Sequence, residues 1–403
     1  MSELKKPLGI DVLTAAQQRI SWTFETFPRI YVSFSGGKDS TVMLHLVAAE
    51  ARKRGRRFGL LFVDLEAQYQ LTIQHVADMY SDCADIAEPY WLALPIALRN
   101  AVSQIEPRWL CWDPAAREQW VREPHSLSIT DESRWRWFRR GMEFEELVPA
   151  FGHDYAQGKL CACFVGIRSD ESLNRFRTVA GHGTKFEGRA WTNYQAQTLY
   201  NIYPIYDWRT EDLWTYFAKT GASYNALYDR MHQAGLTIHQ MRICQPYGDD
   251  QRKGLWLYHL IEPHTWGRVV ARVAGANSGA LYSQESGNVQ GRIKITLPAG
   301  HTWKSFAMLL ISTMPPKSRT HYENKIAQFL AWYRDRGYPN GIPDSAPAEA
   351  EASKKVPSWR RVAKSLLRND YWCKGLSFTQ TKSEAYERYC KIMKTRRAKW
   401  NLI

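Results

Sequence analysis

The sequence predicts an α/β protein built on a doubly wound, mostly parallel sheet. Two apolar runs, residues 30–34 and 58–63, have the length and composition of strands that are buried on both faces. Residues 39–47 lie between them and carry apolar side chains at helical spacing. A strand, a helix and a second buried strand in this order form a parallel unit, which is the repeating element of doubly wound folds.

The composition is that of a folded, soluble protein. Of its 403 residues, 44% are hydrophobic and 13% aromatic, which suffices for about two to three packed domains. No stretch reaches the roughly 18 apolar residues of a membrane span, and the first residues lack a signal-peptide pattern, so we expect a cytoplasmic protein without a membrane partner. Seven cysteines, an odd number, indicate reduced thiols. The net charge of +14 favours anionic partners.

Residues 11–24 are predicted to form an opening helix, and the most informative stretch follows the first strand. Residues 35–40 read Ser-Gly-Gly-Lys-Asp-Ser and join that strand to the next helix through a turn with two glycines. A helix N-terminus leaves backbone N–H groups unpaired and carries partial positive charge, so a glycine turn in front of it lets a phosphate approach closely. Lys38 adds a full charge, and Asp39 is placed to complement the helix start or to hold a phosphate-bound Mg²⁺. We interpret the stretch as a phosphate cradle.

The stretch is not a Walker A loop, because that motif separates its first glycine from the Gly-Lys pair by a four-residue spacer. It resembles the PP-loop of the ATP pyrophosphatase superfamily. Members of that superfamily cut ATP between its α and β phosphates and activate substrates as adenylates. The resemblance implies the same class of chemistry here, on an adenine nucleotide alpha hydrolase-like fold.

The second strand ends at Asp64, which places this carboxylate at the edge of the sheet where ligands of open α/β sheets bind. Residues 60–69, Leu-Leu-Phe-Val-Asp-Leu-Glu-Ala-Gln-Tyr, resemble the second strand of the ATP sulfurylase small subunit and of the phosphoadenosine-phosphosulfate (PAPS) reductases. In those families the backbone after this strand holds the adenine and the ribose, and the resemblance implies the same role here.

Residues 90–95 are predicted to form a third strand, after which the periodicity is lost. Residues 100–151 are rich in tryptophan and arginine, and we expect a helical insertion over the nucleotide cleft. The tryptophans could stack on nucleic-acid bases. A lid that packs its own aromatic side chains is the interpretation that we favour.

A second motif lies in residues 161–177. A short strand is expected to end at Gly166, after which Arg168, Arg175 and Arg177 present guanidinium groups that suit phosphate and sulfate oxygens. The segment resembles the Gly-x-Arg-x-x-Glu-Ser-x-x-Arg pattern of PAPS reductases and ATP sulfurylase small subunits, with Glu171 at the acidic position.

Two further segments extend the resemblance. Residues 203–217 are similar to the Pro-Leu-x-x-Trp-Thr-x-x-Asp-Ile-Trp segment of the family, and residues 223–228 echo its Tyr-Asn-x-Leu-Tyr segment; for both we expect a structural role. The resemblance thus covers about residues 30–245, within a nucleotide-binding domain of residues 1–245. Within the superfamily, the tryptophan-rich insertion and the basic C-terminus are most similar to the IbrA-type, PAPS reductase-like bacterial proteins.

The resemblance fails at the C-terminal cysteine motif. Thioredoxin-dependent PAPS reductases carry their nucleophile in Glu-Cys-Gly-x-His, and the sequence around Cys373 lacks the acid, the glycine spacing and the histidine. The cysteine pairs of the iron-sulfur branch are absent as well. Cys161 and Cys163, with Cys111 and Cys244, could form a metal-thiolate site, but a Cys-x-Cys strand more often buries one thiol and exposes the other. We therefore expect neither an iron-sulfur cluster nor zinc.

The last third of the chain is less informative. Residues 246–338 are predicted to form a helical and mixed accessory region, and the Pro- and Ala-rich residues 339–352 a linker. Residues 353–403 are predicted to form a basic helical tail, since 14 Lys and Arg stand against 4 Asp and Glu from residue 351 onward. Basic residues among aromatic ones fit nucleic acid or an acidic protein partner, and both alternatives stay open.

The predicted function is therefore that of a PAPS reductase-like protein that binds ATP, or a related adenylyl nucleotide such as PAPS or APS, with Mg²⁺. It would cleave the nucleotide between the α and β phosphates in adenylyl or sulfur transfer, with Lys38 and Arg168 as catalytic residues and Asp39 as a Mg²⁺ ligand. The alternative is a nucleotide sensor that acts through a basic surface. The expected nucleotide-binding residues are Ser33, Ser35, Gly36, Gly37, Lys38, Asp39, Ser40, Asp64, Gly166, Arg168 and Arg175.

Overall fold

The computed structural model describes residues 9–100, 103, 106, 108–180, 184–243, 255–273, 297–314, 316–354, 356–367, 370 and 373–378. The chain divides into two compact units. The larger unit comprises residues 1–98, 110–246 and 257–272, and the smaller one comprises residues 99–109, 247–256 and 273–403. Residues 257–272 pack with the larger unit, whereas the predicted boundary near residue 245 places them in the accessory region.

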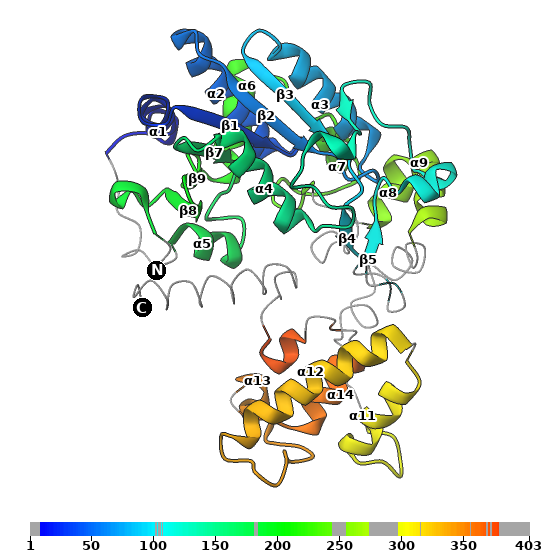
Figure 1. Cartoon of the computed structure of the whole chain (residues 1–403). Coiled ribbons are helices and arrows are strands. Elements are labelled where there is room, and N and C mark those ends of the chain that lie inside the picture. The colour runs from blue at the N-terminus through cyan, green and yellow to red at the C-terminus, as the bar shows by residue number, and fades with distance from the viewer. Residues whose placement is uncertain are drawn as a thin grey trace. The chain divides into compact units, whose positions relative to one another are not determined.

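A seven-stranded sheet in the order β6-β3-β2-β1-β7-β9-β8 forms the centre of the larger unit (Figure 1). All neighbouring strands are parallel except β8, which runs antiparallel to β9. The predicted α/β class with a mostly parallel sheet is confirmed. The strands are β1 (Arg29–Phe34), β2 (Phe58–Val63), β3 (Ala87–Leu92), β6 (Ser128–Ile129), β7 (Cys161–Val165), β8 (Thr192–Ala196) and β9 (Leu199–Ile202).

Helices cover both faces of the sheet because its strands are apolar on both faces. On β1, Ile30 and Val32 join the core cluster that includes residues of α1, α2, α3 and α6. Tyr31 faces the opposite way and packs its ring against Phe151 of α4. The helices of this unit are α1 (Val12–Thr26), α2 (Lys38–Arg54), α3 (Gln70–Asp82), α4 (Phe144–Ala156), α5 (Leu173–Ala180), α6 (Thr210–Thr220), α7 (Leu227–Gln233) and α9 (Pro263–Arg272), with α8 (Leu255–Ile261) beginning just before the assigned range.

The strand order fixes where the sheet can bind a ligand. The chain passes from β1 to β2 and β3 on one side, and it later returns to β7 and β9 on the other side of β1. The direction of winding thus reverses between β1 and β7. In open parallel sheets, ligands bind beyond the carboxyl ends of the strands at such a point. The turn at residues 35–37 follows β1 and Gly166 follows β7, so both predicted motifs lie at this edge.

The insertion at residues 100–151 is less helical than predicted. Its described part contains the short strands β5 (Arg108–Leu110) and β6, 3-10 turns at Pro114–Gln119 and Glu132–Arg134, and the start of α4, while the short strand β4 (Ala97–Arg99) lies just before it. Trp112 is 2% exposed and packs edge-on against Trp120, with the ring centroids 5.2 Å apart. Trp112 is therefore buried, and Trp120 packs half-buried against it.

The smaller unit is helical in its described part, as predicted, but the predicted linker and the first part of the predicted tail contribute residues to its core. Residues 339–352 contain α13, and Ile342 lies in the core of this unit beside Trp359 and Val362 of α14. Arg360, in the predicted tail, pairs with Glu351. Buried apolar side chains outweigh the Pro- and Ala-rich composition that suggested a linker. The helices are α11 (Trp303–Ser312), α12 (Pro316–Arg334), α13 (Ala348–Ala352) and α14 (Trp359–Leu367), with a 3-10 turn at Lys374–Leu376.

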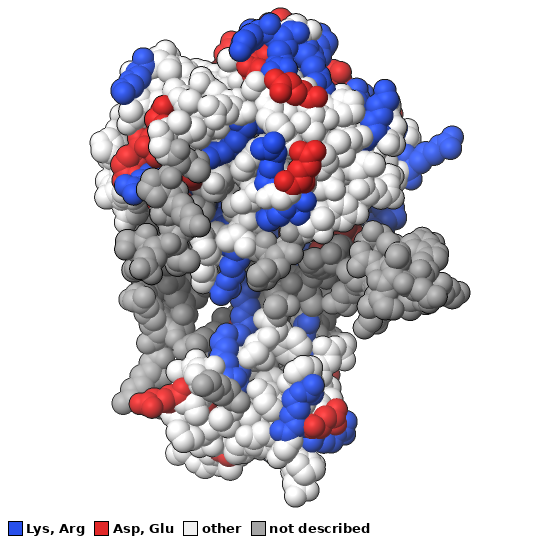
Figure 2. Space-filling view, turned by 90° about the vertical axis from the view of Figure 1, so that its left-hand side faces the viewer, with Lys and Arg blue, Asp and Glu red and all other residues white. Residues whose placement is uncertain are grey.

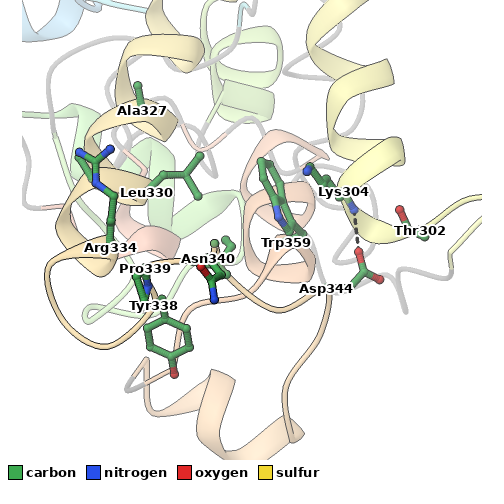
Figure 3. A pocket seen from close by; sticks show the side chains of 13 residues that line it. Thr302, Lys304, Ala327, Leu330, Arg334, Tyr338, Pro339, Asn340, Asp344 and Trp359 are labelled. Atoms are coloured by element: carbon green, nitrogen blue, oxygen red, sulfur yellow. Dashed lines mark hydrogen bonds between the residues drawn. The ribbon is translucent and has the colours of Figure 1, made fainter.

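A pocket of about 730 Å³ lies in the smaller unit between α11, α12, α14 and the loop at residues 338–344 (Figure 3). Lys304, Arg334 and Trp359 line it, while Asp344 accepts hydrogen bonds from the first N–H groups of α11. Residues 274–296 of the predicted accessory region and residues 379–403 of the predicted basic tail lie outside the described residues.

Charge on the larger unit is mixed. On the face that Figure 2 shows, both basic and acidic side chains of its described residues are exposed. No helix in the described ranges is long and apolar enough to cross a membrane.

Candidate functional site

The turn between β1 and α2 has the backbone that a phosphate cradle requires. Gly36 has φ +73°, and a Cβ atom on it would lie 2.9 Å from Thr72 Cγ2, so glycine is required there. Gly37 precedes the first residue of α2 and supplies no side-chain cap. The first helical hydrogen bond joins Thr41 N to Gly37 O, which leaves the N–H groups of residues 38–40 outside the helix ladder. The helix therefore presents its positive end at the carboxyl edge of the sheet.

Hydroxyl groups brace the turn from inside. Ser40 Oγ and Thr41 Oγ1 both donate to the carbonyl oxygen of Gly37, at 3.0 and 2.9 Å. Ser35 Oγ lies 3.0 Å from Ser40 Oγ, and Ser35 itself is exposed. Ser33 is half-buried on β1, one residue from the turn. The sequence predicts two serines and two glycines within residues 33–37 as binding residues. All four lie at this edge of the sheet.

Three charged side chains meet at the start of α2. Lys38 Nζ lies 3.2 Å from Asp39 Oδ2 and donates to the carbonyl oxygen of Met241 at 3.3 Å. Arg168 donates through Nε to Asp39 Oδ1 and through Nη1 to the carbonyl oxygen of Trp208. Burial raises the pKa of Asp39, but the charges of Lys38 and Arg168 outweigh it and hold that pKa below its usual value. Asp39 is therefore ionised and holds two cations at the cradle.

Gly166 explains how Arg168 reaches this point. A Cβ atom on Gly166 would lie 2.9 Å from both the nitrogen and the Cα atom of Ser40. Only a residue without a side chain lets the end of β7 approach the first turn of α2 this closely. The chain then continues to Arg168, which is 2% exposed, so its guanidinium group is enclosed as well as paired.

Arg175 lies further out on α5 and pairs with Glu171 at 3.0 Å, with its own side chain 41% exposed. Burial raises the pKa of Glu171, although the charge of Arg175 lowers it. Arg242 donates to the carbonyl oxygen of Glu171 at 2.6 Å. Arg175 is thus more accessible than Arg168, the other arginine among the expected nucleotide-binding residues.

Asp64 lies at the carboxyl end of β2, as predicted, but its side chain is fully buried. It accepts hydrogen bonds from Trp91 Nε1 at 2.9 Å, from Arg122 and from the backbone of Glu66 at 3.0 Å. These protein donors surround the carboxylate. Asp64 therefore stabilises the loop after β2. To contact a nucleotide directly, its carboxylate would have to give up these hydrogen bonds.

Sequence reasoning missed Glu66, which joins three parts of the larger unit. Its side chain is fully buried, and its backbone has φ 63°. The carboxylate accepts hydrogen bonds from Trp112 N at 2.6 Å and Val121 N at 3.2 Å, and it pairs with Arg272 of α9 at 2.9 Å. No local pattern marks this residue, because its partners lie 46 to 206 positions away.

Sequence reasoning also missed the role of residues 223–242, which we call the strap. It expects a structural role for residues 223–228 and assigns no role to residues 229–242. Asn225 Nδ2 donates to the carbonyl oxygen of Gly36 at 3.0 Å, and the N–H group of Lys38 donates to the hydroxyl of Tyr228 at 2.9 Å. Met241 supplies the carbonyl oxygen that accepts from Lys38 Nζ. The strap therefore contacts the cradle itself.

Strand β7 carries two cysteines with buried side chains. Cys161 and Cys163 are both buried, and burial raises the pKa of the Cys163 thiol to about 12. Cys111 is buried too, and Cys244 lies outside the described residues. Within the described part of the chain, no three or more His, Cys, Asp and Glu side chains are arranged to hold a metal ion.

The chain is similar to several solved structures at low identity. A Candida auris phosphoadenylyl-sulfate reductase in a phosphate complex is 16% identical, with a TM-score of 0.32 over 53% of this chain and 84% of that one. An NH3-dependent NAD synthetase from Campylobacter jejuni is 13% identical, with a TM-score of 0.27 over 72% of this chain and 100% of that one. These likenesses are too distant to assign a ligand to this chain.

Comparisons of sequence are closer. The family model described as "phosphoadenosine phosphosulfate reductase domain" matches residues 29–87 and 117–241, and a "domain of unknown function (DUF3440)" matches residues 235–341. The uncharacterized protein YbdN of Escherichia coli K12 is 43% identical over 407 residues, which cover 100% of this chain and 99% of YbdN. The likeness to IbrA-type proteins stays a prediction. The chain belongs to the family of Escherichia coli YbdN.

Proposed function

We propose that this protein binds ATP, or a related adenylyl nucleotide such as PAPS or APS, at the cradle of residues 35–40, and that it cleaves ATP between the α and β phosphates. The observation that carries the proposal is the meeting of Lys38 and Arg168 at the uncapped start of α2. Two cations and a helix N-terminus converge at the point where the winding of the sheet reverses. This combination favours a polyphosphate over a neutral ligand.

In this proposal the phosphates take over the role that Asp39 now fills as the partner of Lys38. An acceptor atom attacks the α-phosphorus, the bond from that phosphorus to the bridging oxygen breaks, and pyrophosphate leaves with the electron pair. Lys38 and the N–H groups at the start of α2 then stabilise the charge that develops on the phosphate oxygens. Arg168 holds Asp39 in place and presents its planar guanidinium group beside it. The acceptor receives the adenylyl group. In sulfur transfer, hydrosulfide supplied from outside would then attack the adenylated atom, and AMP would leave.

Mg²⁺ would enter with the nucleotide. Asp39 is the proposed protein ligand, and both of its carboxylate oxygens are engaged, Oδ1 by Arg168 and Oδ2 by Lys38. Mg²⁺ in nucleotide sites is commonly held by one or two carboxylates and the substrate's phosphates. Asp39 fits that pattern once Lys38 turns to the phosphates and frees Oδ2.

We also propose that the protein is not a thioredoxin-dependent PAPS reductase. Such a reaction needs an accessible thiolate, and Cys373 is fully buried in the core of the smaller unit. Burial raises the pKa of its thiol to about 12. Together with the missing cysteine motif, this favours transfer chemistry over reduction.

A nucleotide sensor is the second candidate. Lys38 is only 4% exposed, so nucleotide binding would have to rearrange the residues that enclose it. Such a rearrangement could be passed to a partner that binds the basic residues beyond residue 378, either nucleic acid or an acidic protein surface.

Measurement of ATP binding and pyrophosphate release by the variant Lys38→Ala tests the proposal. Removal of the charge at the cradle should weaken ATP binding by about tenfold or more, the scale of a charge-assisted contact. Lys53→Ala is the matched control, because Lys53 lies on the same helix with its side chain 77% exposed. Equal ATP affinity in Lys38→Ala and wild type would disprove the site. ATP binding without pyrophosphate release, across nucleic acids and candidate acceptors, would favour the sensor.

A further inference from the structure

The strap, residues 223–242, is fastened at both ends around the cradle. Near its start, His45 Nε2 lies 2.9 Å from the carbonyl oxygen of Ser223. Asn225 is fully buried and donates both to Gly36 O at 3.0 Å and to Thr72 Oγ1 at 3.1 Å. Near its end, Arg242 donates to the carbonyl oxygen of Glu171 at 2.6 Å. These bonds hold the strap against the turn after β1 and against the segment after β7.

Between these fastenings, the strap occupies the groups that a phosphate would use. The N–H group of Lys38 is the first of α2, and it donates to the Tyr228 hydroxyl at 2.9 Å. Lys38 Nζ donates to the carbonyl oxygen of Met241 at 3.3 Å and lies 5.4 Å from the centroid of the Tyr228 ring. Phosphate oxygens at a helix start accept from this kind of N–H group and pair with this kind of ammonium group. The Tyr228 hydroxyl thus stands where an anion oxygen would be expected.

Packing holds Tyr228 in this position. The residue is 2% exposed, and its ring meets Trp214 of α6 edge-on, with the centroids 5.7 Å apart. A Cβ atom on Gly37 would meet the Tyr228 hydroxyl at 3.5 Å, an ordinary contact, so the hydroxyl lies directly against the turn. A phosphate and this hydroxyl cannot both accept from the N–H group of Lys38 with good geometry, because one N–H group makes one strong hydrogen bond.

We propose that Tyr228 is a gate for the phosphate site: its hydroxyl competes with the nucleotide for the N–H group of Lys38, and nucleotide binding displaces it together with the carbonyl of Met241. The inference rests on the proposed function, since it assumes that a phosphate binds at this cradle. It deepens that function by giving the site a closed state. Because part of the binding free energy of the nucleotide is used to open the strap, the observed affinity is lower than that of the open cradle.

The test compares full-length wild type with Tyr228→Phe, which keeps the ring and removes the hydroxyl. ATP and inorganic pyrophosphate should bind about tenfold more tightly to Tyr228→Phe, the scale of one lost competing hydrogen bond. Tyr224→Phe is the matched control, because Tyr224 lies on the same strap and also packs on Trp214, but its hydroxyl donates to Asp229. Tyr224→Phe should leave the affinity unchanged. Tyr228→Leu, which removes the ring as well, should bind at least as tightly as Tyr228→Phe if it melts like wild type.

Hydrogen exchange without nucleotide gives a second readout. The amide of Lys38 should exchange faster in Tyr228→Phe than in wild type or Tyr224→Phe, because its acceptor is gone. Equal affinity of wild type and Tyr228→Phe would overturn the gate, and weaker binding by Tyr228→Phe would overturn it by making the hydroxyl a phosphate ligand. Unchanged exchange at Lys38 would also overturn it. Failure of the proposed function looks different, since neither protein would then bind ATP or pyrophosphate.

Discussion

The backbone of Gly166 lies against the backbone of Ser40, so closely that a Cβ atom on Gly166 would be 2.9 Å from the Ser40 nitrogen. This contact brings the end of β7 to the first turn of α2. It is also what places Arg168 beside Asp39, two residues that are 129 positions apart in the chain. The charges of the cradle therefore depend on a glycine that carries no charge.

Gly166→Ala should push β7 and α2 apart. We expect a loss of stability of about 1–3 kcal/mol from overpacking and a larger proportional loss of ATP binding, because Arg168 would move away from Asp39. Chemical denaturation and calorimetry measure the two effects. Gly267→Ala is the control: nothing lies within 4 Å of a Cβ atom there, and the residue is inside α9, so this change should be neutral or slightly stabilising. Normal ATP affinity in folded Gly166→Ala would contradict the role of this contact.

Arg168→Lys should keep the positive charge and lose the planar fork that reaches both Asp39 and Trp208 O. We expect a nearly unchanged melting temperature and a severe loss of pyrophosphate release. Arg52→Lys is the matched control, since Arg52 makes an Arg–Asp pair with Asp85 on the surface, with its side chain 46% exposed. If Arg168→Lys instead melts far lower and retains normal activity per folded molecule, the residue is structural.

The pair of Glu66 and Arg272 should be strongly coupled because Glu66 is fully buried and Arg272 is 8% exposed. Glu66→Gln or Arg272→Met alone should cost about 3–5 kcal/mol of unfolding free energy, since each leaves a buried charge without its partner. The double variant should cost clearly less than the two single changes together. Urea denaturation of all four proteins measures this coupling. Asp85→Asn at the surface pair should cost less than about 1 kcal/mol, and a similarly small effect at Glu66 would contradict the prediction.

The described cysteines should be unreactive in the folded protein. Burial raises the pKa of Cys83 to about 11 and that of Cys163 and Cys373 to about 12, so these thiols are protonated at about pH 8. A variant with Cys244 and Cys390 replaced by serine should react with Ellman's reagent only after denaturation. The same protein should form no sulfite from PAPS and thioredoxin. Sulfite at a catalytic rate that is lost in Cys373→Ser or Cys163→Ser would show that a buried thiol is used.

Removal of residues 379–403 should leave the described fold and ATP binding intact. This segment carries seven Lys and Arg against two Asp and Glu, so its loss should flatten the salt dependence of binding to duplex or single-stranded DNA. Titrations at several salt concentrations measure the change. A cut at residue 352 is the contrasting case, because it removes α14 and should unfold the smaller unit. Equal DNA affinity of the full-length protein and the shorter chain at low salt would exclude the tail as the nucleic-acid contact.

The local pattern of the sequence was sufficient to predict the class of the sheet and the position of the cradle. Buried strands at residues 30–34 and 58–63 are recognisable because continuous apolar runs are needed on both faces of a parallel sheet. The turn at Gly36 and the helix that begins at Lys38 follow from backbone requirements that neighbouring residues meet by themselves. The gathering of Lys38, Asp39 and Arg168 followed from strand ends that share one edge of the sheet.

Sequence patterns failed where a residue's role depends on distant partners. The role of Asp64 as a ligand stays a prediction, and the sequence does not show that Trp91 and Arg122 enclose its carboxylate. The linker prediction for residues 339–352 rested on composition, and burial of Ile342 overrides it. The composition of a segment indicates which structure the segment can form alone. Its burial depends on which distant residues pack against it in the folded chain.

The sequence by itself determined the parallel sheet, the position of the cradle and the residues that place charge there, because each of these follows from interactions within a few residues or from the shared edge of strands. Only the tertiary structure decided that Glu66 pairs with Arg272, 206 positions away, and that Tyr228 reaches the N–H group of Lys38 across 190 positions. Such contacts leave no periodicity in the sequence. They exist because packing of the whole chain brings one particular donor to one particular acceptor, and their energies belong to the folded state alone.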